Sequence, residues 1–496
     1  MTVARSGRRR SRFDALFDPR GVIVAGASTH PGKFGFVALH NILANGYGGL
    51  VAATNRERAD VLGRPTYADL DEIPDGDYDL VFVCTPAASN RDVLERAAAR
   101  GITAAFIASA GYGEAGEDGV RAQAELVALA DDLGILLVGP NGQGLVSTPS
   151  RLCAQIVAPY PPAGSIGVAS QSGNFVSSFL NLSRASGVGV SRAISVGNAA
   201  QVGVIDMLEH FADDPATTVG LAYVEGIGDG RAFADRLEEV CRRLPVVLVK
   251  GGATGHGARA AASHTGSLAT DDRVFDGMCR QVGATRARSV AEAFDLAAAF
   301  ATLPLPSGPR SAIVTTVGGW GVLAADAVAS TDLELAALPD SLRDELDALL
   351  PPRWSRNNPI DLAGGETKDT MSEVLRAVVD EASIDSLLVL GAGIQSNQGR
   401  LEREGPYYPD HGLERIVAFH DRQDERYAVE AAAAVSRTGK PVALATELAT
   451  ADPDNAAVRA VRATGHYCFP SAERAVVAID AMWRRRRWLD ERDVGR

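Results

Sequence analysis

The sequence has few cysteines and no long apolar run. Its five cysteines, Cys84, Cys153, Cys241, Cys279 and Cys468, are scattered and include no Cys-x-x-Cys pair. This spacing excludes a disulfide framework and a thiolate zinc site. No apolar run approaches the roughly 18 to 20 residues that cross a bilayer. We therefore expect reduced, mostly buried thiols in a cytoplasmic protein without a membrane segment.

Positive charge is in the minority. Lys and Arg number 49 against 62 Asp and Glu, which gives a formal net charge of −13. This balance excludes a general nucleic-acid binder and means that anionic ligands need local cationic sites. A basic arm over residues 1–11 is followed by charged and turn residues rather than by the apolar core of a signal peptide.

The 496 residues suffice for roughly three domains. Between residues 12 and 147, short apolar runs that end in turn residues alternate with stretches of helical periodicity. Buried parallel strands and their connecting helices give this pattern. Similar series cover 160–303 and 309–490, with Pro/Gly-rich linkers at 160–165 and 303–309. The sequence thus predicts an α/β protein with three consecutive doubly wound domains.

One stretch interrupts the alternation of predicted strands and helices. Residues 395–427 are polar, and we expect them to be only partly helical. So long an insertion is either a surface excursion of the third domain or a functional flap. We favour the surface excursion.

The first strand-to-helix turn, Gly26–Gly35, reads GASTHPGKFG. Its glycines allow a pyrophosphate to approach the start of the next helix, where Lys33 adds positive charge. The spacing is not G-x-G-x-x-G, and Asn55-Arg56 follow the second strand where an NAD site has an acidic residue. An extra phosphate, from coenzyme A or NADP, suits these residues. The candidate contacts along this sheet edge are Gly26, Ser28, Lys33, Gly35, Asn55, Arg56, Thr85, Pro86, Ser109, Gly111 and Asn141.

Two turns in the second domain combine glycine with small polar residues. They are SQSGNF from Ser170 and SVGN from Ser195, each placed where a strand is expected to meet a helix. Free backbone N–H groups at helix starts can hold a phosphate. The candidate phosphate-binding residues are Gln171, Ser172, Gly173, Gly197 and Asn198.

His264 is the strongest catalytic candidate. It lies in GGATGHGARAAASHTGSLA (251–269), whose small and polar residues predict a flexible loop with an exposed imidazole. A neutral imidazole nitrogen can attack phosphorus when a carboxylate orients the other ring nitrogen. Glu225, at the end of a predicted strand, is the candidate carboxylate, and His256 is the alternative nucleophile.

Several segments together resemble the α subunit of NDP-forming acyl-CoA synthetases, the superfamily of ADP-forming acetate–CoA ligase and succinyl-CoA synthetase. In the second domain they are SQSG, SVGN, YVEGIGDGR and GARAAASHTGSLA; in the first, LFDPRGVIVAGAS, PGKFG, SAGYGEAGEDG and GPN; in the third, PPRWSRNNPIDLAGG and FPSAERAVVAI. The resemblance implies a Rossmann-like CoA-binding domain followed by two flavodoxin-like, succinyl-CoA synthetase-like domains.

The resemblance also implies a phosphohistidine mechanism. In the family, acyl-CoA and phosphate give an acyl phosphate and free CoA, and the phosphoryl group passes to a histidine and then to ADP. All steps reverse for synthesis of the acyl-CoA. His264 matches the phosphorylated histidine, with Thr265 and Gly266 beside it, and Glu225 matches the glutamate that holds it.

Nucleotide chemistry in this family needs an ATP-grasp domain of roughly two hundred residues, for which three α/β domains leave no room. We therefore expect a separate β subunit to supply ADP or ATP and Mg²⁺, a hetero-oligomer, and no metal site on this chain. Two alternatives are a CoA-binding scaffold without turnover and an NADP-dependent oxidoreductase. The intact histidine and glutamate disfavour the first, and the missing G-x-G-x-x-G disfavours the second.

The chain departs from the family pattern at three places. It has GPNGQG at 139–144, Asn174-Phe175 after SQSG, and Gly-Gly-Trp-Gly at 318–321. Phe175 and Trp320 add bulk to these turns. The departures favour a larger or aromatic acid over acetate as the substrate.

Overall fold

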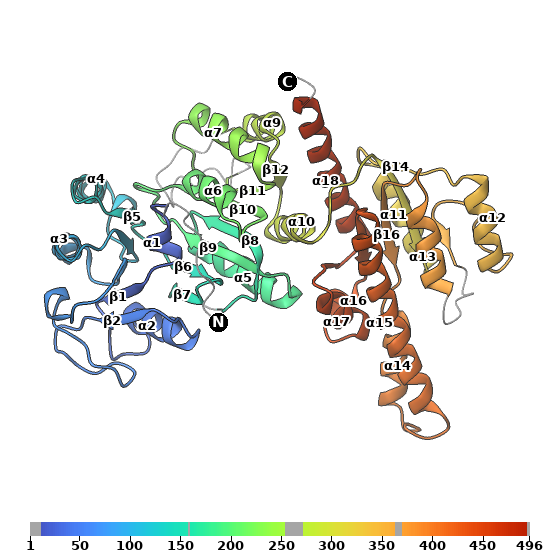
Figure 1. Cartoon of the computed structure of the whole chain (residues 1–496), viewed down its shortest axis with the longest axis horizontal. Coiled ribbons are helices and arrows are strands. Elements are labelled where there is room, and N and C mark those ends of the chain that lie inside the picture. The colour runs from blue at the N-terminus through green and yellow to red at the C-terminus, as the bar shows by residue number, and fades with distance from the viewer. Residues whose placement is uncertain (1–10, 157–158, 253–270, 363–369, 494–496) are drawn as a thin grey trace. The chain divides into compact units, whose positions relative to one another are not determined.

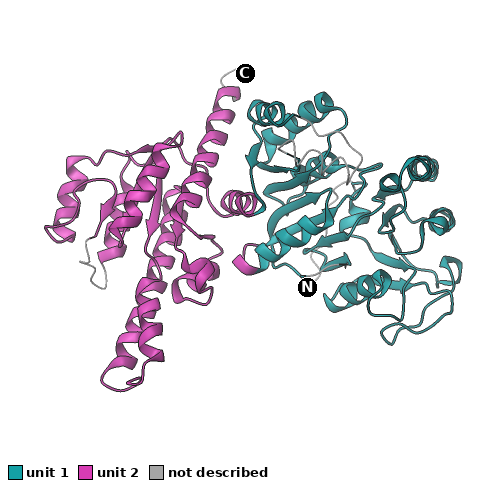
Figure 2. Cartoon of the chain, turned by 180° about the vertical axis from the view of Figure 1, so that it is seen from behind, with its two compact units in different colours: residues 1–184, 189–290 teal, residues 185–188, 291–496 magenta. Residues whose placement is uncertain are grey.

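The computed structural model describes residues 11–156, 159–252, 271–362 and 370–493. The chain divides into two compact units, 1–184 with 189–290 and 185–188 with 291–496 (Figure 2). Unit 1 contains two β-sheets and unit 2 contains a third (Figure 1). None of the helices in the described ranges is long and apolar enough to cross a membrane.

The first sheet is parallel, in the order β2-β1-β3-β4-β5. Its strands are β1 (Gly21–Ala25), β2 (Leu50–Ala53), β3 (Leu80–Val83), β4 (Ala104–Ile107) and β5 (Leu136–Val138). The main helices are α2 (Phe34–Ala44), α3 (Asn90–Ala99) and α4 (Glu117–Asp132). Strands β1, β3, β4 and β5 are buried along their whole length, as their continuous apolar runs predict. The strand order reverses between β1 and β3, and open α/β sheets bind ligands beyond the carboxyl ends of the strands at such a point.

The second sheet has the order β12-β11-β10-β8-β9-β6-β7. Its parallel strands are β8 (Ala163–Ser170), β9 (Val190–Ser195), β10 (Val219–Val224), β11 (Val246–Lys250) and β12 (Thr285–Ala287). Helices α5 (Gly173–Ser186), α6 (Val204–Asp213), α7 (Gly230–Arg243) and α9 (Asp272–Val282) connect them. The carboxyl ends of β8 and β10 are neighbours, so the segments that follow them meet at one edge.

A hairpin extends this sheet beyond the predicted pattern. Strands β6 (Gly144–Ser147) and β7 (Leu152–Gln155) pair with each other, and β6 pairs antiparallel with β9. The predicted boundary at 147 therefore falls at the end of a strand of the second sheet, and the predicted linker at 160–165 overlaps the start of β8. Strands of four residues without an intervening helix carry too little periodicity to be recognised in the sequence.

The short helix α1 (Asp14–Phe17) packs against both sheets of unit 1, contacting β4 and β6. The Phe17 ring stacks on His210 of α6 at a centroid distance of 5.3 Å. The guanidinium of Arg192 on β9 lies over the same ring, 5.7 Å from its centroid. Burial of these side chains joins the beginning of the described chain to the second sheet.

Unit 2 contains a parallel sheet in the order β14-β13-β16-β17-β18, with β15 paired to β13. Its strands are β13 (Arg310–Thr315), β14 (Glu334–Leu335), β15 (Ile360–Asp361), β16 (Ser386–Leu390), β17 (Val442–Ala445) and β18 (Cys468–Phe469). Its helices are α10 (Val290–Thr302), α11 (Gly318–Ala329), α12 (Asp340–Leu349), α13 (Thr370–Asp380), α14 (Ile394–Glu404), α15 (Leu413–Thr438), α16 (Leu448–Ala451), α17 (Ala456–Ala463) and α18 (Ala472–Asp493). Helix α10 belongs to this unit because Tyr467 and Arg474 bond its buried Asp295.

The polar stretch 395–427 is more helical than the sequence predicts. Helices α14 and α15 pack against each other as an antiparallel hairpin (Figure 1). Between them, buried Asp424 accepts hydrogen bonds from the backbone and hydroxyl of Ser396, at 2.6 and 2.7 Å. Small and polar residues take many of the buried positions, so the apolar stripe that reveals a helix in a sequence is weak here.

Candidate active site

The turn after β1 is held tightly against the following helix. Gly26 has a φ of +85°, and a Cβ on Gly35 would lie 2.1 Å from the carbonyl oxygen of Gly26. Lys33 precedes α2 in an extended conformation, and the Ser28 hydroxyl accepts a hydrogen bond from the backbone of His30. Asn55, after β2, donates from Nδ2 to the carbonyl oxygen of Ala27 at 2.9 Å. The structure thus brings together five candidate contacts around one turn, and exposed Arg56 follows Asn55.

Asn90 joins the ends of β3 and β4, and the sequence analysis did not select it. Thr85 Oγ1 donates to its Oδ1 at 2.9 Å, and its Nδ2 donates to Ser109 Oγ and Tyr112 Oη at 2.9 and 2.8 Å. Asn90 is fully buried, so these bonds replace solvent. The network fixes Thr85 and Ser109, with Pro86 next to Thr85, beyond the carboxyl ends of β3 and β4. An asparagine at the start of a helix reads as a cap, which is why its role went unpredicted.

Asn198 connects the first sheet to the second. Its Nδ2 donates to Glu114 Oε2 at 2.6 Å and to Gln123 Oε1 at 2.9 Å, and its Oδ1 accepts from Asn141 at 3.3 Å. Glu114 also accepts from the backbone of Gly111 at 2.5 Å. Burial raises the pKa of Glu114, but these hydrogen bonds outweigh it and hold the pKa below its ordinary value.

The expectation that Gly197 and Asn198 start a helix is wrong. Helix α6 begins at Val204, and the backbone N–H of Asn198 donates to the carbonyl oxygen of Pro140 at 3.0 Å. A Cβ on Gly197 would lie 2.2 Å from that same oxygen. The two residues pack the β9–α6 loop against Pro140 and Asn141, so this N–H is not free for a phosphate.

Gln171, Ser172 and Gly173 lie where β8 passes into α5, as predicted. The Ser170 hydroxyl accepts from the Ser172 backbone at 3.1 Å and shapes the turn. Gln171 Oε1 accepts from the backbone N–H groups of Glu225 and Gly226, at 2.5 and 3.2 Å. Two candidates chosen separately in the sequence are therefore neighbours in the structure.

Gln143, one of the departures from the family pattern, lies over the start of α5. A Cβ on Gly173 would lie 2.2 Å from its side chain. Its Nε2 donates to Asn174 Oδ1 at 3.3 Å. The altered residues at 143 and 174 thus touch each other beside the predicted phosphate turn.

The chain leaves β11 next to Glu225. The backbone of Gly251 donates to the carbonyl oxygen of Val224 at 2.9 Å, and Lys250 Nζ donates to the carbonyl oxygens of Gly251 and Gly252 at 3.2 and 3.4 Å. Burial lowers the pKa of Lys250. His264, His256, Thr265 and Gly266 lie outside the described residues. The structure therefore places Gln171 and Glu225 beside the point where the chain enters the segment with the predicted nucleophile.

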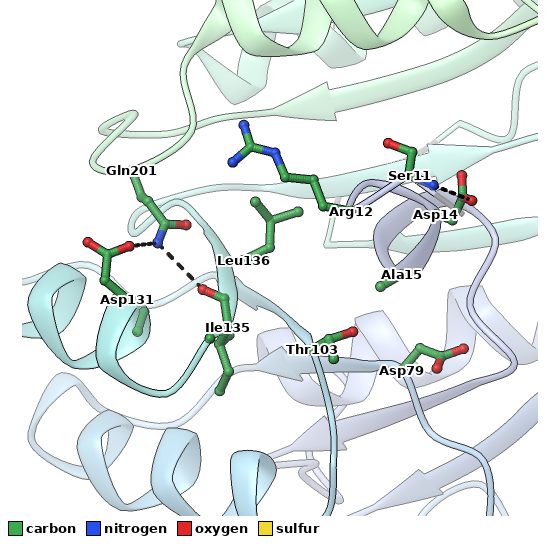
Figure 3. Close-up of a pocket in the computed structure, with 12 residues that line it drawn as sticks. Ser11, Arg12, Asp14, Ala15, Asp79, Thr103, Asp131, Ile135, Leu136 and Gln201 are labelled. Atoms are coloured by element: carbon green, nitrogen blue, oxygen red, sulfur yellow. Dashed lines mark hydrogen bonds between the residues drawn. The ribbon is translucent and has the colours of Figure 1, made fainter. Parts of the chain in front are cut away.

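A cavity of about 560 Å³ lies at the amino ends of the strands of the first sheet, away from the candidate site residues at their carboxyl ends (Figure 3). Its lining includes Arg12, Asp79, Thr103, Asp131 and Gln201. Asp79 is bonded to Arg20, and Asp131 accepts from Gln201. No predicted site residue lines it. Across the described ranges, no group of three or more His, Cys, Asp or Glu is arranged to hold a metal ion.

Family models match each of the three sheets. A CoA-binding domain matches residues 20–148, a succinyl-CoA ligase-like flavodoxin domain matches 163–300, and a ligase-CoA domain matches 311–394. These matches confirm the expected fold class, a CoA-binding α/β domain followed by succinyl-CoA synthetase-like domains.

Known proteins align with most of the chain. The α subunit of ADP-forming acetate–CoA ligase I of Pyrococcus furiosus is 36% identical over 76% of this chain and 82% of its own length. ADP-forming acetate–CoA ligase I of Archaeoglobus fulgidus is 36% identical over 76% of this chain, which spans 54% of that longer protein. The "dinucleotide forming" acetyl-coenzyme A synthetase 1 of Ca. Korarchaeum cryptofilum, solved with phosphate and ADP, superposes with a TM-score of 0.81 at 28% identity. It covers 97% of this chain and 98% of its own.

The sequence comparisons and the fold agree on one family. The resemblance found in the sequence is confirmed by relatives that are 36% identical to this chain over 76% of its length and by a structure of the same architecture. The chain belongs to the family of the α subunits of ADP-forming acetate–CoA ligases, which are acid–thiol ligases.

Proposed function

We propose that this chain carries the CoA site and the phosphorylated histidine of an ADP-forming acyl-CoA synthetase. The observation that carries the proposal is the hydrogen bond of Gln171 with Glu225, next to Gly251, where the chain enters the segment that contains His264. A phosphate-binding helix start and a carboxylate that can orient an imidazole are the two groups that phosphoryl transfer to histidine requires.

In the first step of the proposed reaction, phosphate attacks the thioester carbonyl of acyl-CoA. The C–S bond breaks, CoA leaves as the thiol after taking up a proton, and an acyl phosphate forms. The turn Gly26–Gly35 would hold the CoA pyrophosphate, because no side chain caps the first N–H groups of α2 and a helix start favours an anion. Asn55 and Arg56 would take the additional phosphate of CoA.

In the second step, a ring nitrogen of His264 attacks the phosphorus of the acyl phosphate. The bond from phosphorus to the acyl oxygen breaks, and the carboxylate leaves. The start of α5 at Gln171, Ser172 and Gly173 would stabilise the phosphoryl oxygens, and Glu225 would accept a hydrogen bond from the other ring nitrogen. The phosphoryl group then passes to ADP.

We propose that a separate ATP-grasp β subunit supplies the ADP and Mg²⁺ for the last step. The relatives of matching length are α subunits, and this chain spans only about half of the single-chain ligase from Archaeoglobus fulgidus. The five free thiols suit a reducing compartment, and we propose the cytoplasm. The comparisons give no support to the scaffold or oxidoreductase alternatives.

The acid is proposed to be larger than acetate. The Phe175 ring lies on Tyr223 at a centroid distance of 4.0 Å, close to the predicted phosphate turn. A ring in this position narrows the space for water and adds an apolar surface for a bulky acyl group.

Reconstitution tests the proposal. The chain and a β subunit of the family are mixed with ADP, phosphate, Mg²⁺ and a panel of acyl-CoAs, and ATP is measured. We expect ATP only when both proteins are present, with none from His264→Ala and undiminished CoA binding by that variant. ATP formation by His264→Ala would contradict the proposal.

A further inference from the structure

The side chain of Gln143 lies directly over the first residue of α5. A Cβ on Gly173 would lie 2.2 Å from Gln143 Cγ and 2.5 Å from Gln143 Oε1. The Nε2 group of the same amide donates to Asn174 Oδ1 at 3.3 Å. Both ends of the amide are thus placed at the start of the helix, with Nε2 on Asn174 and Oε1 beside Gly173.

Gln143 Oε1 is an unused acceptor. The atom is buried, and no described residue donates a hydrogen bond to it. Buried polar atoms in folded proteins almost always have a partner, because an unsatisfied one is destabilising. A buried acceptor without a donor at a predicted binding turn therefore indicates a ligand that donates to it.

A second unused polar group lies on a neighbouring strand. Ser195 is fully buried at the end of β9, and its hydroxyl has no hydrogen-bond partner among the described residues. Ser195 is in register with Ser170, whose hydroxyl bonds the backbone of Ser172 in the turn before α5. Paired residues of parallel strands project from the same face of the sheet. Gly142 packs on Ser195 as well, since a Cβ on Gly142 would lie 3.0 Å from the Ser195 carbonyl oxygen. Both unused groups thus lie beside the turn that leads into α5.

The start of α5 favours an anion, whereas an acceptor oxygen there disfavours a fully ionised one. The positive end of the helix dipole and the first N–H groups attract oxyanions. An amide oxygen only accepts, so it is unfavourable next to an ionised oxygen and favourable next to an oxygen that carries a proton. Inorganic phosphate at neutral pH has ionised oxygens and keeps at least one proton, whereas sulfate keeps none. A protonated tetrahedral anion therefore matches this combination of groups.

We propose that Gln143 makes the start of α5 specific for hydrogenphosphate: its Oε1 accepts a hydrogen bond from the P–OH group, while the helix start binds the ionised oxygens. The inference rests on the proposed function, in which phosphate attacks the thioester and α5 binds phosphoryl oxygens. The proton stays on the phosphate oxygen, and no bond to Gln143 forms or breaks. The hydrogen bond to Asn174 keeps the amide in the orientation that rejects fully ionised anions such as sulfate.

The test compares anions with and without a proton. Gln143→Met keeps an unbranched side chain of similar length and replaces the amide by a thioether, which is a weak acceptor. The chain and a β subunit of the family form ATP from acyl-CoA, ADP and phosphate. Arsenate, which is protonated as phosphate is, and sulfate are added as inhibitors. We expect KM for phosphate and the inhibition constant of arsenate to rise about tenfold or more, the usual weight of a hydrogen bond to a charged group. The inhibition constant of sulfate should stay equal or fall, and KM for acyl-CoA should not change.

Gln398→Met is the matched control. Gln398 also bonds a neighbouring side chain, since its Nε2 donates to Glu402 Oε1 at 3.4 Å, but it lies on α14 in the other unit. We expect the constants for all the anions to equal those of the wild type. Equal changes for phosphate, arsenate and sulfate in Gln143→Met would show a general disturbance of the turn and would overturn the inference. Unchanged constants would overturn it too.

A second variant guards against a loss of folded protein. Gln143→Leu also removes the acceptor, and the ratio of the sulfate constant to the phosphate constant does not depend on the fraction of enzyme that is folded. We expect this ratio to fall in both variants. No ATP from the wild type with its β subunit would refute the proposed function and the inference together. ATP formation with the same ratio in the wild type and both variants would refute the inference alone.

Discussion

The side-chain oxygen of Gln171 lies 2.5 Å from the backbone nitrogen of Glu225, so the start of α5 and the end of β10 share a hydrogen bond. The same amide bonds both the N–H and the carbonyl oxygen of Gly226. The amide supplies this pattern from two separate atoms, an acceptor oxygen and a donor NH2 group, whereas an ionised carboxylate only accepts.

Gln171→Ala should slow phosphorylation of the histidine more than it affects binding. It removes one backbone hydrogen bond to Glu225 and two to Gly226, each worth about 1 kcal/mol, so we expect a loss of roughly tenfold to a hundredfold in the rate. Single-turnover labelling with phosphate and acyl-CoA measures it. Gln201→Ala is the control, because Gln201 holds the backbone of Leu137 at 2.7 Å in the first sheet. Equal rates for the two variants would contradict this role of Gln171.

Gly35→Ala should weaken CoA binding and the fold of the first domain. The new Cβ would meet the carbonyl oxygen of Gly26 at 2.1 Å, so the turn and α2 must separate. Such overpacking costs about 1 to 3 kcal/mol of folding free energy. Titration calorimetry with CoA and denaturant unfolding check both effects. Gly48→Ala, where a Cβ meets nothing within 4 Å, should bind CoA as the wild type does. Normal CoA affinity in Gly35→Ala would remove the turn from the proposed site.

Asn198→Ala should loosen the connection between the two sheets of unit 1. The variant leaves Glu114 and Gln123 without their shared donor, and we expect a loss of about 1 to 3 kcal/mol. Urea unfolding measures the change. An unchanged unfolding midpoint would show that water replaces the amide without cost.

The buried ion pair of Arg192 and Asp214 should make the free energy of unfolding depend on pH. Their Nε and Oδ2 atoms are 3.1 Å apart. Burial raises the pKa of Asp214, but Arg192 and further hydrogen bonds outweigh it, so the pKa lies below its ordinary value. The stabilisation is therefore present above the pKa of an unfolded aspartate, about 3.9, and is lost as the pH falls through the lower folded value. Asp214→Ala should lower the free energy of unfolding by about 3 to 5 kcal/mol at pH 7. Thermal unfolding should show that the difference in stability between the variant and the wild type becomes smaller at acidic pH. A gap that is constant with pH would contradict this account.

The strands with continuous apolar runs were predictable because burial on both faces demands such runs. All five strands of the first sheet lie in predicted apolar runs, and so do most residues of β8 to β11, although β8 begins inside the predicted linker. The hairpin β6–β7 was not predictable from the sequence, because its pairing with β9 is a tertiary contact that no local pattern indicates. The α14–α15 hairpin was underestimated because polar Ser396 and Asp424 bond each other inside it.

The candidate site likewise has residues that the sequence predicts and residues that only tertiary contacts reveal. Gln171 and Glu225 follow the carboxyl ends of the neighbouring strands β8 and β10, and Gly26 follows β1, so the topology of each sheet places them at its carboxyl edge. Asn90, Gln143 and Lys250 act through partners distant in the sequence or through backbone carbonyls, and their residue types are common in ordinary helices and loops. Only the folded chain reveals them.

Mapping the phosphorylated residue tests the central claim most directly. The chain is incubated with labelled phosphate and the acyl-CoA panel, digested under alkaline conditions that preserve phosphohistidine, and the labelled peptide is sequenced by mass spectrometry. The account predicts a phosphoryl group on His264 that is absent from His264→Ala and reduced in Glu225→Ala. A phosphoryl group on His256, or one on His264 that forms equally well without Glu225, would contradict it.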